Sequence, residues 1–357
     1  MSWHSIRGHG AIVEQFRQAL ARGRLASTFL FVGPAGIGKR QFALKLAQGL
    51  LCERVPEAQL DPCEQCPACQ QVAALTHPDV EIVNKPADKN SIPIDLLIGD
   101  KEHRGQAGLL YNISRKPYSG RRKIAIIDDA DSLYIGDLAA ANALLKTLEE
   151  PPPRSILILV GTSLQRQLAT IRSRCQVIRF SPLSDDDVAE ILVERGLCEA
   201  GAAARAARQG QGSVQAAGQW CDERLIEFRS AWLDVLSQRE FDASAAAKMA
   251  GQFIDEAGKE SAVKRRRLRL VISQAEGFYR QALLTMTTGQ AANDDQLATA
   301  VATALRWLPG DEALAACLDV CISAYAHVDA NANQATLLEW LLDELSQAAR
   351  GEAVPAI

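Results

Sequence analysis

A glycine-rich loop at residues 33–40 carries the residue types that bind phosphate groups. It reads Gly-Pro-Ala-Gly-Ile-Gly-Lys-Arg and lies between an apolar run, 28–32, and a predicted helix, 41–51. Its three glycines are Gly33, Gly36 and Gly38. Glycine lets backbone N–H groups turn toward phosphate oxygens, the helix N-terminus attracts anions, and Lys39 would reach the outer phosphates. The order strand, loop, helix therefore predicts a nucleotide-binding loop.

The residue after this lysine departs from the pattern of a hydrolysing loop. A serine or threonine at that position ligates Mg²⁺ through its hydroxyl group, whereas this chain has Arg40. An arginine cannot ligate a metal, and it brings positive charge close to where the ion would lie. We therefore expect that the loop keeps its shape and has lost hydrolysis. The sequence leaves open whether ATP or ADP still binds.

Two carboxylates, Asp128 and Asp129, follow a second apolar run at 124–127, and Thr162 and Ser163 follow a third. Unbroken apolar runs of this length suit strands buried on both faces of a parallel sheet, where functional groups collect beyond the carboxyl ends. Asp128 has the position of a metal-binding aspartate. Asp129 has that of a general base, but it is one methylene shorter than the glutamate of ATPases. The carboxylates could instead cap the next helix, although the glycine loop favours a nucleotide site.

Four cysteines lie in a polar stretch, 52–69, directly after the helix that follows the glycine loop. They are Cys52, Cys63, Cys66 and Cys69. Two C-x₂-C steps join the last three, and the intervening loop lets Cys52 fold back onto them. Four thiolates form a closed tetrahedral set for zinc, with no coordination position left for a substrate. We expect a structural zinc site, with His77 as a substitute ligand or, more in keeping with its Thr-His-Pro-Asp context, a turn residue.

The composition is that of a helix-rich globular protein. Its 357 residues allow two or three domains, and 48% are hydrophobic, so the chain can bury a sizeable core. The net charge of −4 argues against a protein that is basic all over, as a DNA-coating protein would be. No apolar run reaches the about 20 residues of a membrane helix, and the N-terminus lacks a signal-peptide core, so we expect a cytoplasmic protein. The five remaining cysteines are then expected to be small buried hydrophobic residues rather than disulfide partners.

Hydrophobic periodicity divides the chain into three predicted domains: 1–181, 182–220 and 221–357. The first builds a parallel sheet, and the second is a short helical segment ending in Gly-Gln-Gly-Ser-Val-Gln at 210–215. The third is helical, with apolar residues at three- and four-residue spacing in 225–236, 245–254, 265–284, 314–326 and 337–345. The glycine-rich stretch 99–108 fits no element. A basic run at 264–269 could face DNA but is more typical of a solvated helix face or a subunit contact.

Five stretches of the sequence together resemble one family. They are 31–39, the four-cysteine insertion, Ile-Ile-Asp-Asp-Ala-Asp at 126–131, Ala-Asn-Ala-Leu-Leu-Lys-Thr-Leu-Glu-Glu-Pro-Pro at 141–152 and Ser-Arg-Cys at 173–175. Their combination is similar to the bacterial clamp-loader AAA+ subunits of DNA polymerase III, strongly over residues 5–181 and moderately to about 217. The resemblance implies an α/β AAA+ (P-loop NTPase-like) N-terminal domain with a parallel sheet, a small helical lid domain and an all-α C-terminal collar domain.

Within this family, the chain resembles the non-hydrolysing, stator-type members. The motor subunits, gamma and tau, have Thr or Ser after the loop lysine, Glu as the second carboxylate, and an arginine in the lid. This chain has Arg40, Asp129 and Gln215 at these places, so no intrinsic ATPase activity is expected. One alternative is an active, gamma-like clamp-loader ATPase that tolerates Arg40. Another is a nucleic-acid-binding protein that acts through the zinc loop and the run 264–269.

The resemblance assigns a separate role to Arg174. In the family this arginine reaches the γ-phosphate held by a neighbouring motor subunit, as an arginine finger in trans. The implied partners are the gamma/tau motor subunits and the delta subunit and, through the assembled complex, the sliding clamp (beta) and primed DNA. The implied bound groups are structural zinc and ATP or ADP held without hydrolysis; no membrane partner is expected.

Overall fold

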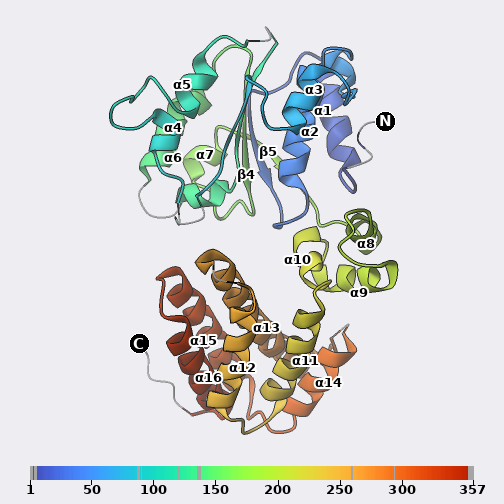
Figure 1. Cartoon of the computed structure of the whole chain (residues 1–357), viewed down its shortest axis with the longest axis vertical. Coiled ribbons are helices and arrows are strands. Elements are labelled where there is room, and N and C mark those ends of the chain that lie inside the picture. Colours follow the sequence, from blue (N-terminus) through green and yellow to red (C-terminus); the bar gives the residue numbers. More distant parts are fainter. Residues whose placement is uncertain are drawn as a thin grey trace. The chain divides into compact units, whose positions relative to one another are not determined.

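The computed structural model describes residues 3, 6–86, 89, 91–118, 121–134, 138–258, 260–292 and 294–352 (Figure 1). The chain divides into two units, Met1–Cys221 and Asp222–Ile357. Among the described residues, no helix combines the length and the apolar character needed to cross a membrane. The outer ends of the first and third predicted domains, residues 1–2 and 353–357, lie outside the described part of the chain.

A parallel five-stranded sheet forms the centre of the first unit. Its strands are β1 (Thr28–Val32), β2 (Val80–Val83), β3 (Lys123–Ile127), β4 (Ser155–Gly161) and β5 (Gln176–Arg179), in the spatial order β2-β3-β4-β1-β5. Val32 is paired with Gly161, and Ile127 with Leu159. The carboxyl ends of β1, β3 and β4 therefore meet at one edge of the sheet, which confirms the predicted α/β fold class.

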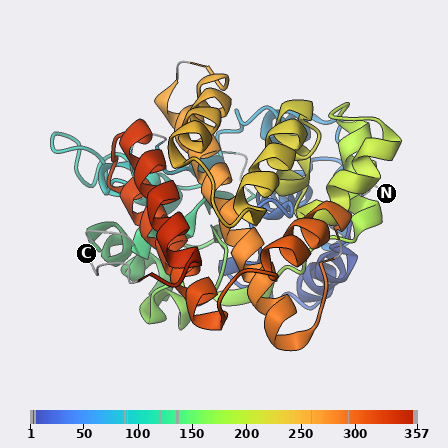
Figure 2. The same ribbon diagram turned by 90° about the horizontal axis from the view of Figure 1, so that it is seen from below.

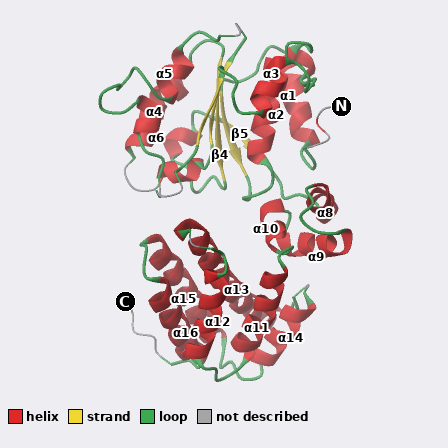
Figure 3. Cartoon of the chain, in the orientation of Figure 1, coloured by secondary structure: helices red, strands yellow, loops and turns green. Residues whose placement is uncertain are grey.

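Helices cover both faces of this sheet (Figures 1 and 3). One face carries α1 (Gly10–Ala21), α2 (Lys39–Leu51) and α3 (Pro67–Ala73), and the other α4 (Asp95–Ile98), α5 (Leu109–Ser114), α6 (Ala139–Glu149) and α7 (Ala169–Arg172). Two short 3₁₀ helices, Glu57–Gln59 and Ala130–Tyr134, lie in the connections. In β1, Phe29 and Phe31 enter the core below α1 and α2, whereas Leu30 and Val32 enter the opposite core. Burial on both faces explains the unbroken apolar runs.

The glycine-rich stretch 99–108 is a closed loop between α4 and α5. Gly99 and Gly108 both have left-handed backbone angles, with φ of 86° and 85°. A Cβ atom on Gly108 would lie 2.6 Å from the backbone nitrogen of Gly99, so the two ends of the loop touch. Two glycines are needed because any side chain at this crossing would collide with backbone.

Three further helices complete the first unit: α8 (Asp185–Glu194), α9 (Ala200–Gly210) and α10 (Val214–Gln219). They share a small hydrophobic core that includes Val188, Leu192 and Ala206. Ser184 and Ser213 begin α8 and α10, and each side-chain oxygen accepts a hydrogen bond from a backbone N–H three residues later. These N-caps set where the two helices start.

A disulfide joins Cys198 to Cys221 in this helical group, which corrects the expectation that the scattered cysteines are buried free thiols. Cys198 lies between α8 and α9, and Cys221 follows α10. Their Cα atoms are 5.6 Å apart although 23 positions separate them in sequence, so the packing of α10 against α8 brings them within disulfide distance. Cys317 and Cys321 are buried thiols, as predicted.

In the second unit, the described residues form only helices and their connections (Figures 1 and 2). They are α11 (Glu223–Ser237), α12 (Ala243–Asp255), α13 (Ser261–Thr288), α14 (Asp295–Ala304), α15 (Asp311–Asp329) and α16 (Gln334–Ala349). Each of the five predicted helical segments lies within one of them. The periodicity analysis does not predict α14, because its buried face consists largely of alanine, which gives a weak apolar signal.

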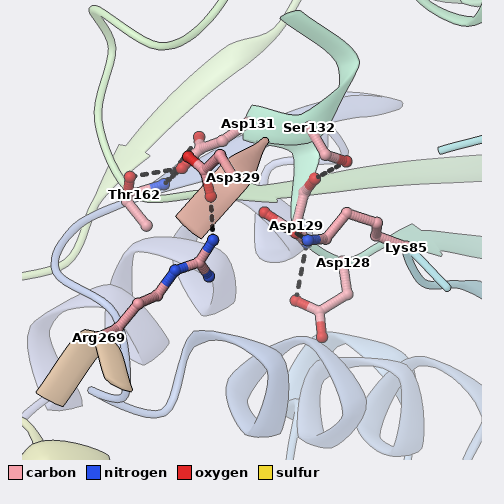
Figure 4. A network of polar contacts seen from close by, with 8 residues as sticks. All are labelled: Lys85, Asp128, Asp129, Asp131, Ser132, Thr162, Arg269 and Asp329. Carbon is pink, nitrogen blue, oxygen red and sulfur yellow. Dashed lines mark hydrogen bonds and ion pairs between the residues drawn. The ribbon is translucent and has the colours of Figure 1, made fainter. Parts of the chain in front are cut away.

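The basic run 264–269 lies in α13, and much of its charge is used inside the second unit. Lys264, Arg267 and Arg269 form ion pairs with Asp255, Asp222 and Asp329, respectively; the last pair is drawn in Figure 4. Arg267 also lies over the ring of Phe253. These contacts favour a helix face that stabilises the fold over a surface that binds DNA.

Candidate functional site

The glycine loop connects the end of β1 to the start of α2. Its first N–H, from Gly33, donates to the carbonyl of Thr162 at 3.2 Å, which ties the loop to the end of β4. Gly36 and Gly38 have φ of 75° and 95°, and Gly38 is the residue before α2. The loop thus needs glycine for its backbone path, and it has the predicted position at the carboxyl edge of the sheet.

Lys39 is buried and turns back onto its own loop. Its Nζ donates to the carbonyls of Gly33 at 2.6 Å and Pro34 at 2.5 Å. Burial lowers the pKa of Lys39, while the negative charges of Asp131 and Asp128 act in the opposite direction. The ammonium group is therefore held in the loop, beside carboxylates that come from β3.

Arg40 pairs with the first of the two carboxylates. Its Nη1 lies 3.2 Å from Oδ2 of Asp128, across 88 positions of sequence. The two side chains are 35% and 26% exposed, so the pair lies at the accessible edge of the site. The residue that departs from the hydrolysing pattern thus contacts the aspartate predicted to bind metal.

The second carboxylate is paired as well. Asp129 has a left-handed backbone, with φ of 59°, and its Oδ2 lies 3.7 Å from Nζ of Lys85 (Figure 4). Burial raises the pKa of Asp129, and Lys85 acts in the opposite direction. Sequence analysis did not select Lys85, although its place just after the strand 80–83 could have indicated it.

Asp131 is a third carboxylate, and it organises the end of β4 (Figure 4). It is buried and accepts hydrogen bonds from the backbone N–H of Thr162 at 3.0 Å, from the hydroxyl of Thr162 and from the side-chain amide of Gln167. Thr162 therefore lies at the site, as predicted, with its hydroxyl committed to Asp131. The sequence contained Asp131 but did not indicate which role it has.

Helix α10 closes one side of the glycine loop. The N–H of Val214 donates to the carbonyl of Gly36 at 3.1 Å. A Cβ atom on Gly36 would lie 2.3 Å from Oγ of Ser213 and 2.5 Å from Cβ of Gln215. The segment that was predicted to carry a lid residue thus touches the loop directly, and Gln215 lies beside it.

The fold family implies a magnesium ion bound with the nucleotide at this place, and the residues do not fit one. Mg²⁺ requires oxygen ligands at about 2.0–2.1 Å in octahedral geometry. Arg40 offers N–H donors and no lone pair, and its guanidinium already contacts Asp128. Each carboxylate of the pair has a cation of the chain beside it.

Arg174 lies at the opposite end of β1 from the glycine loop. Its carbonyl accepts a hydrogen bond from the hydroxyl of Thr28, the first residue of β1, at 2.8 Å. Its guanidinium donates from Nε to Glu149 at 2.8 Å and from Nη1 to the carbonyl of Thr170 at 2.8 Å. A strand rises about 3.3 Å per residue, so the five residues of β1 separate Arg174 from the loop by roughly 15 Å.

The four cysteines of the 52–69 loop converge at the far end of α2. The sulfur atoms of Cys52, Cys63, Cys66 and Cys69 all lie within 4.8 Å of one another. A tetrahedral zinc ion with Zn–S bonds of about 2.3 Å needs sulfurs about 3.8 Å apart, so the set fits. Backbone N–H groups approach three of the sulfurs at 3.3 to 3.5 Å, as in sites that stabilise thiolates.

His77 is a turn residue, as its context favoured. It is buried, and its Nδ1 accepts a hydrogen bond from the backbone N–H of Asp79 at 3.0 Å. Within the described residues, the metal-compatible cluster consists of the four cysteines without this histidine.

Comparison with known proteins matches the first unit to one family. The family described as DNA polymerase III, delta subunit, covers residues 8–184. Through this segment, the chain belongs to the family of DNA polymerase III clamp-loader subunits. The delta-prime subunit of Pseudomonas aeruginosa is 37% identical over 154 residues, which are 43% of each chain. That of Bacillus subtilis is 33% identical over 184 residues, 52% of this chain and 51% of the relative.

Motor-type members of the same family also match. The tau subunit of Bacillus subtilis is 31% identical over 207 residues, 55% of this chain and 34% of the relative. A solved gamma subunit-related protein of Thermotoga maritima aligns with a TM-score of 0.43 and 17% identity over 95% of this chain and 99% of its own. The chain spans about half the length of the curated delta-prime relatives it matches. Because both types match, the distinction between them depends on the residues of the site.

Proposed function

We propose that this chain is a non-hydrolysing (stator) subunit of the delta-prime type in the bacterial DNA polymerase III clamp loader. It would assemble in the cytoplasm with the gamma/tau motor subunits and the delta subunit, which together load the sliding clamp on primed DNA. The pairing of Arg40 with Asp128 carries the first half of this proposal. A site with an arginine in place of the metal-binding hydroxyl lacks a group on which phosphoryl transfer depends.

The second half of the proposal is that Arg174 acts as an arginine finger in trans. Its distance from the loop, the length of β1, is too great for it to act on a nucleotide held by its own chain. Its guanidinium is 30% exposed and pairs with Glu149, itself 51% exposed. An exposed ion pair of this kind contributes little stability, so a phosphate of a neighbouring subunit can replace the glutamate.

The cysteine cluster is proposed to hold a structural zinc ion. Helix α2 has 13 residues and is therefore about 20 Å long, which places the cluster far from the glycine loop. Four thiolates also leave no open coordination position for chemistry. Metal analysis of the purified chain is expected to give one zinc per chain, and a content well below one would refute this part.

The test of the finger compares Arg174→Ala with Arg172→Ala, a control in the preceding helix, each in a loader assembled from purified subunits. Arg174→Ala should leave the chain folded and slow ATP hydrolysis, because a finger contributes about 10³-fold or more at the site it serves. Arg172→Ala should hydrolyse ATP at the native rate. Equal turnover in the Arg174→Ala and native assemblies would exclude the finger role.

The active-ATPase alternative has its own measurement. Steady-state hydrolysis by the isolated chain with Mg²⁺ should be absent, both in the native chain and in Arg40→Thr, because Asp129 also differs from the glutamate of motors. Clear turnover by the native chain would identify a motor and contradict the stator assignment.

A further inference from the structure

The charged groups at the glycine loop balance without a metal ion. Three carboxylates surround it, Asp128, Asp129 and Asp131, and three cations of the same chain lie among them, Lys39, Arg40 and Lys85. In a metal-dependent site, part of the carboxylate charge is neutralised by Mg²⁺. Here Arg40 and Lys85 contact the two aspartates at the end of β3 instead.

The loop nevertheless keeps groups that bind phosphate. The backbone N–H groups of Gly36, Ile37 and Gly38 donate no hydrogen bond to another described residue. They precede α2, a helix of 13 residues whose N-terminus adds a favourable dipole for anions. The contact of α10 uses the carbonyl of Gly36 and leaves these donors in place.

We propose that this site binds a nucleoside diphosphate or triphosphate free of divalent metal, with the Arg40 guanidinium as the cation that contacts its phosphates. The inference rests on the proposed function, in which the loop of a non-hydrolysing subunit still holds a nucleotide. A guanidinium is always charged and donates two parallel hydrogen bonds to phosphate oxygens. It is also anchored at the start of α2, so its position requires no ion from solution.

The exposure of the Arg40–Asp128 pair determines how a phosphate would enter. Both side chains are partly open to solvent, so an incoming phosphate competes with Asp128 for the guanidinium. The competition has a consequence that a metal site does not share. Removal of the Asp128 charge should strengthen nucleotide binding here, whereas it would weaken binding that depends on a metal held by this aspartate.

The experiment is calorimetric titration of the full chain with ADP and with ATP, in Mg²⁺ and in EDTA. The native chain should bind with affinities that agree within about twofold between the two conditions. Arg40→Thr should bind about tenfold more weakly in EDTA, through loss of a charge-assisted hydrogen bond, and recover with Mg²⁺. Arg22→Thr, an exposed control at the end of α1, should bind as the native chain does.

Asp128→Asn supplies the second readout. It should bind either nucleotide more tightly than the native chain in EDTA, and circular dichroism would confirm that each variant is folded. Three results would overturn the inference: no binding of ADP or ATP by the native chain in either condition, at least tenfold tighter binding on addition of Mg²⁺, or weaker binding by Asp128→Asn. The finger assay with Arg174→Ala requires no nucleotide in this chain, so metal-dependent binding alongside a slow Arg174→Ala loader would refute this inference alone.

Discussion

The glycine loop and the Arg174 segment lie at opposite ends of β1, and each contains an arginine paired with a carboxylate. Arg40 contacts Asp128 within a set of alternating charges that also includes Lys39 and Lys85. Arg174 contacts Glu149, a half-exposed residue at the end of α6. The first arginine belongs to a balanced network, whereas the second has one carboxylate partner that faces solvent.

The difference shows how one chain can lose a catalytic group and keep another. In the network, each charge has neighbours that hold it, so a replacement such as Arg40 is stabilised by groups already present. An exposed pair is worth about 0–1 kcal/mol and can exchange its partner. An arginine that must reach another subunit is better placed in the second kind of environment.

Gly36→Ala should break the loop side of this comparison with the largest effect. Alanine at φ of 75° is strained, and its Cβ would overlap Ser213 and Gln215. We expect the free energy of unfolding of the first unit to fall by about 1–3 kcal/mol, as measured by urea denaturation. Gly10→Ala is the control, since nothing lies within 4 Å of its Cβ position. Equal stability of the two variants would mean that α10 does not press on the loop.

Glu149→Gln tests the Arg174 side with a smaller expected effect. Loss of the exposed pair should change the free energy of unfolding by less than about 1 kcal/mol. In an assembled loader, ATP turnover should equal or exceed the native rate, because Arg174 is released from its partner. Glu150→Gln, at the adjacent position, is the matched control. Turnover that falls only in Glu149→Gln would mean that Glu149 holds Arg174 in its working position.

Asp129→Asn should have the smallest effect and a characteristic pH dependence. Burial raises the pKa of Asp129 in the folded chain, so its ionised form costs stability above that pKa. The variant should therefore be more stable than the native chain at neutral pH, by up to about 0.5 kcal/mol, and the gain should vanish as pH falls through the raised pKa. Asn also tolerates the left-handed backbone. Asp128→Asn, which loses the pair with Arg40, should show no such gain in thermal unfolding.

Local pattern was sufficient for much of the fold. The strands 28–32, 80–83, 124–127 and 155–160 were predicted within one residue at each end, because burial on both faces leaves unbroken apolar runs. The fifth strand, Gln176–Arg179, has exposed residues and a weaker pattern, and the sequence did not delimit it. The alanine-rich α14 was missed for a related reason.

The site divides along the same line. Glycine spacing, the carboxylates after an apolar run and the two C-x₂-C steps are short-range features, so the sequence indicated the loop, Asp128, Asp129 and the cysteine set by itself. Which cation meets which carboxylate depends on the strand order β2-β3-β4-β1-β5. That order brings Arg40 to Asp128 and Lys85 to Asp129, and no local pattern contains it.

The sequence by itself therefore determined the chemical groups of this protein: a phosphate loop without its metal-binding hydroxyl, four thiols at zinc spacing, and an arginine in Ser-Arg-Cys. The tertiary structure decided their partners, including the pairs of Arg40 and Arg174, the contact of α10 with Gly36, and the Cys198–Cys221 disulfide. The physical reason is range. Residue type and spacing act over a few positions, whereas each of these contacts joins residues at least 23 positions apart through the packing of strands and helices.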